Sequence, residues 1–241
     1  MFWKRKKEIS GLGFQHYVPL RLSENLPGIF KQKAKENNYA DIYKTYIQLL
    51  VSETFIIAGM IGCCRPDIIT GIYKQNEKNH EKLMKVTRNG LNQMIDAMKK
   101  RGEFSLTSFA SSFKRPEIYV LPKGNSGKEI PIEIISILGI PFLFGYTFGH
   151  DYPKLFFELL EKRLQELIKK EPNTIVVIGF LSIYSSLIED VDRSLLLDIV
   201  RYSNDHLPNE EKVIHQKIIS IYQEIAIKLA EEYEQTVGFP E

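Results

Sequence analysis

The chain has 241 residues, of which 44% are hydrophobic and 26% are charged. These values are those of an ordinary globular protein, and they exclude a collagen-like or largely disordered chain. The formal net charge of +2 conceals an asymmetry, because residues 1–128 hold 22 Lys and Arg against 11 Asp and Glu, a formal charge of +11, whereas residues 129–241 hold 10 against 19, a formal charge of −9. This division indicates an anionic partner for the first half, or self-association between the halves.

Targeting segments and metal sites are not expected from the sequence. The basic N-terminus lacks the apolar run of roughly 7–15 residues that a secretory signal requires. The best candidate for a membrane span, residues 47–64, contains Gln48, Ser52 and Glu53, so it is expected in a protein core. Cys63 and Cys64 are adjacent and have no zinc-site spacing around them. We expect a cytoplasmic protein with no cofactor and no bound metal.

Helical periodicity dominates the first hundred residues. Apolar side chains recur every three to four positions over residues 35–64, and Arg65-Pro66 ends that helix. A second helical stretch covers residues 67–101 and stops at Gly102. Residues 117–121 and 130–135 differ, because they are rich in β-branched and aromatic side chains and are separated by a glycine-containing loop. That pattern predicts a β-hairpin.

Helical patterns return in the second half. Asp151, followed by Pro153, is typical of a helix start, and the apolar spacing then predicts a helix as far as Lys170. Residues 174–188 are ambiguous, because they begin like a buried strand and continue like a helix. From Pro208 to about residue 235, apolar positions recur every three to four residues, which predicts a long amphipathic helix.

The predicted fold is mainly α-helical with one β-hairpin at about residues 117–135. If residues 134–148 and 174–179 form short strands instead, the fold becomes α/β. The charge pattern suggests a basic, mostly helical half, 1–128, and an acidic half, 129–241, that ends in the long amphipathic helix. A single domain that includes both halves also fits this pattern.

Cations gather on the second predicted helix. Four lysines between residues 74 and 85 follow spacings of four, four and three, so they share one helix face, and two further lysines lie in the predicted hairpin loop. Such a row can neutralise the phosphates of a nucleic-acid backbone, without reading bases, or contact an acidic protein. The simpler interpretation is a solvated face that pairs with nearby glutamates. The candidate partner-binding residues are Lys74, Lys78, Lys82, Lys85, Arg88, Lys123 and Lys128.

Catalytic candidates are few. His150-Asp151 is the kind of dipeptide that holds a metal in helical HD-type phosphohydrolases, with His80 upstream and Asp192 downstream as further candidates. Imidazoles and carboxylates can hold a divalent ion that activates water for attack on phosphorus. Two adjacent residues do not make a family resemblance, and Asp151 is already expected to cap a helix.

We therefore expect a non-enzymatic interaction protein, a helical subunit or adaptor whose basic half faces an anionic partner. That partner is a nucleic-acid backbone, an acidic protein or a second copy of the chain. One alternative is a metal-dependent phosphohydrolase of the HD type. Another is a membrane-associating protein that anchors through Phe2, Trp3 and the basic residues 4–7.

Overall fold

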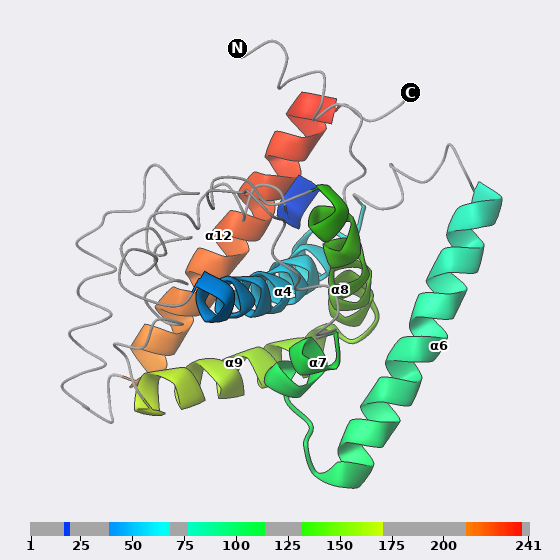
Figure 1. Ribbon diagram of the computed structural model, residues 1–241. Coiled ribbons are helices and arrows are strands. Elements are labelled where there is room, and N and C mark those ends of the chain that lie inside the picture. The colour runs from blue at the N-terminus through cyan, green and yellow to red at the C-terminus, as the bar shows by residue number, and fades with distance from the viewer. Residues whose placement is uncertain (1–16, 20–38, 68–76, 114–131, 171–210, 238–241) are drawn as a thin grey trace.

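Helices make up nearly all of the part of the chain that the structure, a computed structural model, describes (Figure 1). The described residues are 17–19, 39–67, 77–113, 132–170 and 211–237. The helices are α4 (Tyr39–Cys64), α6 (Glu77–Arg101), α7 (Leu106–Ser112), α8 (Ile132–Asp151), α9 (Pro153–Lys170) and α12 (Glu211–Val237).

The expected β-hairpin and the α/β alternative are both wrong, because the described residues contain no strand. Helix α8 covers residues 134–148 and the end of the expected hairpin, while 117–131 and 174–179 lie outside the described ranges. The reason is that α8 is apolar on nearly every side. Such a segment shows neither helical nor alternating periodicity, so hydrophobicity alone does not separate a buried helix from a buried strand.

Helix α4 forms the centre of the fold. Every residue from 53 to 62 is buried, so this helix is enclosed on all sides. It packs against α7, α8, α9 and α12, whereas α6 packs mainly against the other side of α8. Across Figure 1, the main helices therefore follow the order α12, α4, α8 and α6.

Glycines bring the backbones of α4 and α8 into direct contact. A Cβ atom at Gly145 would overlap the carbonyl group of Phe55, and one at Gly149 would overlap the carbonyl group of Gly59. At the same contact, the thiol of Cys63 donates a hydrogen bond to the carbonyl oxygen of Gly149, at 3.3 Å. Helices approach this closely only where small residues line the contact, so the position of α8 depends on its glycines.

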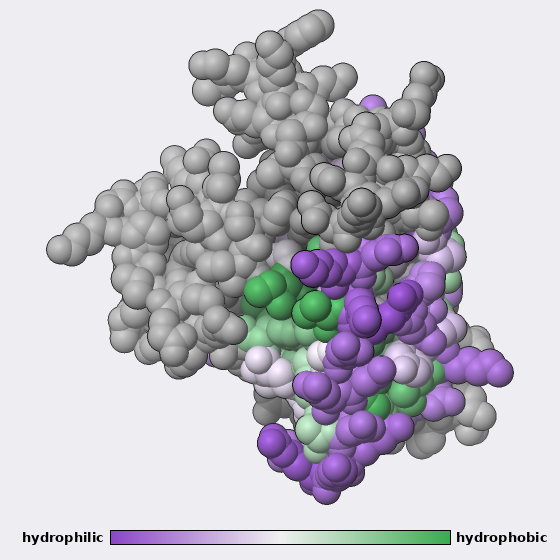
Figure 2. Space-filling view, turned by 90° about the vertical axis from the view of Figure 1, so that its right-hand side faces the viewer, coloured by the Kyte–Doolittle hydropathy of each residue, from purple (hydrophilic) through white to green (hydrophobic). Residues whose placement is uncertain are grey.

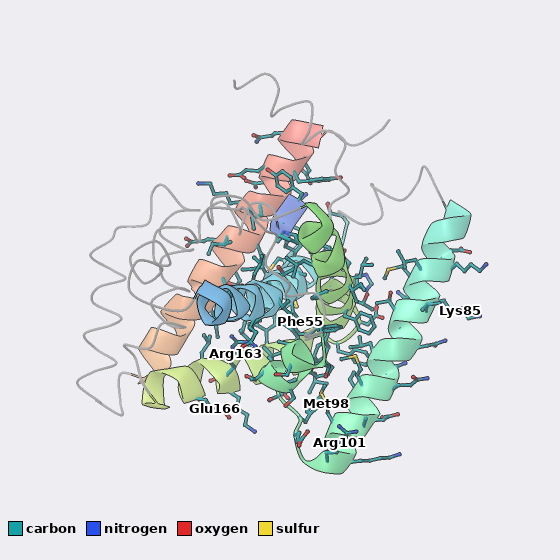
Figure 3. The ribbon with its side chains drawn as sticks, viewed as in Figure 1. Phe55, Lys85, Met98, Arg101, Arg163 and Glu166 are labelled. Carbon is teal, nitrogen blue, oxygen red and sulfur yellow. The ribbon has the colours of Figure 1, made fainter. Side chains whose placement is uncertain are left out.

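Aromatic rings fill the space between α4, α7 and α8. The ring of Phe55 stacks on Phe109 of α7 with a centroid distance of 5.7 Å, and it lies 6.4 Å from Phe148 of α8. Phe109 and Phe148 are themselves 5.0 Å apart. Figure 3 shows Phe55 among these three helices. Each such pair contributes roughly 0.5–1.5 kcal/mol beyond the burial of its area, so this cluster fixes the short helix α7 on the core.

Both charge halves contribute to one hydrophobic core. Its buried side chains come from α4, α6 and α7 of the basic half and from α8, α9 and α12 of the acidic half. The expected helices at 153–170 and in the C-terminal segment are confirmed as α9 and α12. Among the described helices, none has the length and apolar character that a membrane crossing requires.

Replacing Gly149 by alanine should destabilise the protein by roughly 2 kcal/mol or more, because the added methyl group overlaps the backbone of α4. The matched control is Gly90→Ala, where the new Cβ would meet only the tip of the Phe144 ring, at 3.0 Å. That side chain can shift, and alanine favours the helix over glycine by about 1 kcal/mol. Urea unfolding of both variants measures the difference, and equal stabilities would contradict the proposed backbone contact.

Candidate functional site

Helix α6 lies at the edge of the molecule and buries only one of its faces (Figure 1). Its buried apolar side chains, Met84, Leu91, Ile95 and Met98, recur at helical spacing. The helix ends at Arg101, and the next residue, Gly102, has a φ of 69°, in the left-handed region that favours glycine. The amide of Glu103 bonds to the carbonyl oxygen of Met98 at 3.1 Å and closes this cap.

The opposite face of α6 combines cations with exposed apolar side chains. We define the α6 basic face as Lys82, Lys85 and Val86, with Leu83 at its edge. The two lysines are exposed, Val86 is 65% exposed and Leu83 is 37% exposed. Lys85 points away from the other helices (Figure 3). Figure 2 looks onto this side of the molecule, where hydrophilic side chains gather over α6 beside apolar surface.

The lysines of the α6 basic face have no internal partner in the part of the chain that the structure describes. No ion pair joins Lys82 or Lys85 to another described residue. By contrast, the ammonium group of Lys99 lies 5.4 Å from the centroid of the Phe104 ring. Lys82 and Lys85 therefore remain available to groups outside the molecule.

The other candidate cations are not placed with these two lysines. Arg88 lies on α6, but its guanidinium is bonded within the molecule. Lys78 also lies on α6, with a side chain outside the described part. Residues that fall outside the described ranges altogether are Lys74, Lys123 and Lys128.

Two separate sequence candidates, Arg88 and the dipeptide His150-Asp151, meet where α6 touches the end of α8. The Nε atom of Arg88 donates to one carboxylate oxygen of Asp151 at 2.8 Å, and the Nδ1 atom of His150 lies 2.7 Å from the other oxygen. Burial alone would raise the pKa of Asp151, but the hydrogen bonds from Arg88 and His150 outweigh it and lower the pKa. The carboxylate is therefore held ionised between two internal partners.

This arrangement fastens α6 to α8. The hydroxyl of Tyr152 adds a second link, because it donates to the Oδ1 atom of Asn92 at 2.8 Å. Asp151 was expected to cap the start of the following helix. It is instead the last residue of α8, and Tyr152 separates it from α9, which begins at Pro153. The ion pair Arg88–Asp151 and the neutral hydrogen bond Tyr152–Asn92 therefore both connect α6 to the end of α8.

The described residues offer no metal centre at this place. Among them, no group of three His, Cys, Asp or Glu side chains could hold an ion. The side chain of His80 and all of Asp192 lie outside the described part of the chain. Because the guanidinium of Arg88 already occupies Asp151, the pair His150-Asp151 is better explained as part of the helix contact.

A third polar group lies inside the core, and sequence reasoning missed it. Arg163 of α9 donates to Ser52 at 2.8 Å and to a carboxylate oxygen of Glu53 at 3.5 Å, while Tyr222 of α12 donates to the other oxygen at 3.4 Å. Glu53 is 1% exposed and Arg163 is 7% exposed. Figure 3 shows Arg163 on α9, next to α4. These contacts connect three helices inside the core, where Glu53 and Arg163 are buried and Ser52 is half-buried.

The position of Glu53 within an apolar helix was visible in the sequence, but its partner was not. Arg163 follows 110 residues later in an ordinary amphipathic helix. Burial raises the pKa of Glu53 to about 7, although Arg163 and the hydroxyl of Tyr222 act in the opposite direction. A buried charge pair of this kind fixes how helices align, and removing one partner is strongly destabilising.

The chain matches no family model, no curated protein and no solved structure. Geometry therefore has to select the candidate site. The ion pairs Arg88–Asp151 and Glu53–Arg163 are both formed within the molecule. The α6 basic face is exposed, and its two lysines have no partner among the described residues. This face is the candidate functional site.

The stability of the protein should fall as the pH rises from about 4.5 to about 7, because Glu53 has a higher pKa in the folded state than its ordinary value of 4.5. In this window the unfolded chain has already lost the proton that the folded protein keeps, and above it the contribution is constant. The measurement is urea unfolding at a series of pH values, with Glu53→Gln for comparison. If the variant keeps the wild-type slope, Glu53 does not titrate as described.

Proposed function

We propose that this chain is a non-enzymatic interaction protein that uses the α6 basic face to bind an anionic surface of a partner. The observation that carries the proposal is the exposure of Val86, at 65%, beside two lysines that have no partner among the described residues. Interfaces typically place an apolar centre within a polar rim.

The remainder of α6 supports this role. Its buried side is anchored by apolar residues and by the Arg88–Asp151 ion pair, so the outward side is presented on a fixed helix. A preorganised surface loses little conformational freedom on binding. Exposed lysines attract an anionic partner over roughly one Debye length, about 8 Å at physiological salt, so binding should weaken as salt rises.

An enzymatic role has less support. The phosphohydrolase alternative needs Asp151 as a metal ligand, and that carboxylate is bonded to Arg88 and His150. The pair Glu53–Arg163 is buried and cannot contact a substrate. The described part of the chain therefore offers a surface for binding in preference to a site for chemistry.

The double variant Lys82→Glu/Lys85→Glu should elute from immobilised heparin, a generic polyanion, at a clearly lower salt concentration than the wild type. Each lost contact between a lysine and the polyanion lowers the slope of log affinity against log salt concentration by about 1. The measurement is the salt concentration at the elution peak.

The matched control is Lys154→Glu/Lys162→Glu, which makes the same change of charge at two exposed positions of α9. This control should elute close to the wild type. An equal shift in both double variants would mean that heparin responds to net charge alone, and the α6 basic face would lose its special role.

A further inference from the structure

We propose that Asp151 acts as an internal competitor of the anionic partner, because it holds Arg88, a third cation in series with Lys82 and Lys85. On binding, an oxyanion of the partner replaces the Asp151 carboxylate at the guanidinium, and Arg88 joins the α6 basic face. This inference rests on the proposed function, because it adds a regulated cation to the same surface.

Arg88 lies on α6 at the border of the α6 basic face. It follows Lys85 by three residues, as Lys85 follows Lys82, so successive members of this series are neighbours on the helix surface. The side chain of Arg88 is 49% exposed although it is bonded to Asp151. An anion that contacts Lys85 therefore lies close to a guanidinium that solvent already reaches.

The ion pair between Arg88 and Asp151 can be exchanged for an external one. The Nε atom of Arg88 donates to one carboxylate oxygen at 2.8 Å, whereas the contact from Nη2 to the other oxygen is longer, at 3.4 Å. Ion pairs in which one partner is this exposed add little to stability. An oxyanion that accepts both bonds at ordinary length would form the stronger, bidentate contact.

The Asp151 carboxylate keeps other partners when Arg88 leaves it. The Nδ1 atom of His150 lies 2.7 Å from one of its oxygens, and the Asp151 side chain is 20% exposed. Helix α6 also keeps its place, because the hydrogen bond from Tyr152 to Asn92 and the buried apolar residues of α6 do not involve Arg88. The exchange therefore moves one side chain and leaves the two helices in contact.

A third cation matters because the α6 basic face is only weakly positive. Exposed Glu81 lies one turn before Lys85 and offsets part of its charge. In the unbound protein, Asp151 neutralises Arg88 as well. Release of Arg88 then offers the partner a planar guanidinium, which matches the geometry of carboxylate and phosphate groups better than an ammonium does.

The test compares the affinities of variants for a fluorescent heparin oligosaccharide over a series of salt concentrations. Asp151→Asn removes the internal competitor and should bind about two- to fivefold more tightly than Glu158→Gln, which makes the same change of charge at an exposed position of α9. Arg88→Gln should lower the slope of log affinity against log salt concentration by about 1. Its matched control, Lys162→Gln on α9, should keep the wild-type slope.

The double variant Arg88→Gln/Asp151→Asn shows whether the two residues act through each other. Without Arg88, the substitution of Asp151 should raise the affinity for heparin no more than Glu158→Gln does. A gain of the same size with and without Arg88 would contradict the competition, since Asp151 would then act through its charge alone.

A measurement on the wild type covers the case in which a variant does not fold. The nuclear magnetic resonance signal of the Arg88 Nε–H group should move as the heparin oligosaccharide is added, because its acceptor changes from Asp151 to the ligand. A signal that stays in place at saturating heparin would overturn the inference.

The outcomes separate this inference from the proposed function. If Lys82→Glu/Lys85→Glu weakens heparin binding, but Asp151→Asn behaves like Glu158→Gln and Arg88→Gln keeps the wild-type slope, the α6 basic face binds anions and Arg88 takes no part. If none of these substitutions changes heparin binding beyond its control, both the inference and the proposed function are wrong.

Discussion

The contact between the backbones of α4 and α8 is the constraint on which the rest of the structure depends. Gly145 and Gly149 allow α8 to rest directly on α4, and the phenylalanine cluster around Phe55 fills the space beside that contact. Helix α6 is then placed by α8, since it packs mainly on that helix and bonds to its last residue through Arg88. The orientation of the α6 basic face therefore follows from two glycines on another helix.

The buried pair Glu53–Arg163 complements this contact on the other side of α4. Burying charges costs several kcal/mol per ion, and only good hydrogen bonding offsets that cost. Here Ser52 and Tyr222 supply additional bonds, while the Nε atom of Arg163 has no partner among the described residues. Such a group adds little to stability, but it penalises any packing of α9 or α12 that separates its members.

The sequence predicted helices well where one face is polar. The apolar spacing of α9 and α12 is visible in the chain, and both helices form where it indicates. Prediction failed at α8, because a helix that is apolar on nearly every side has no polar face to mark its period. The lysines of α6 were found from their spacing, but the internal ion pair that sets Arg88 apart from them was not. That separation depends on a contact with Asp151, which lies 63 residues later in the chain.

Cys63 gives the central contact a property of another kind. Burial raises the pKa of its thiol to about 12, with a further contribution from Cys64, and the sulfur rests on the carbonyl oxygen of Gly149. Since the thiolate is the reactive form, this cysteine should react slowly while the helices are together. Alkylation of Cys63 would therefore report how readily α4 and α8 separate, and the chain carries a natural chemical probe of local opening at the contact between them.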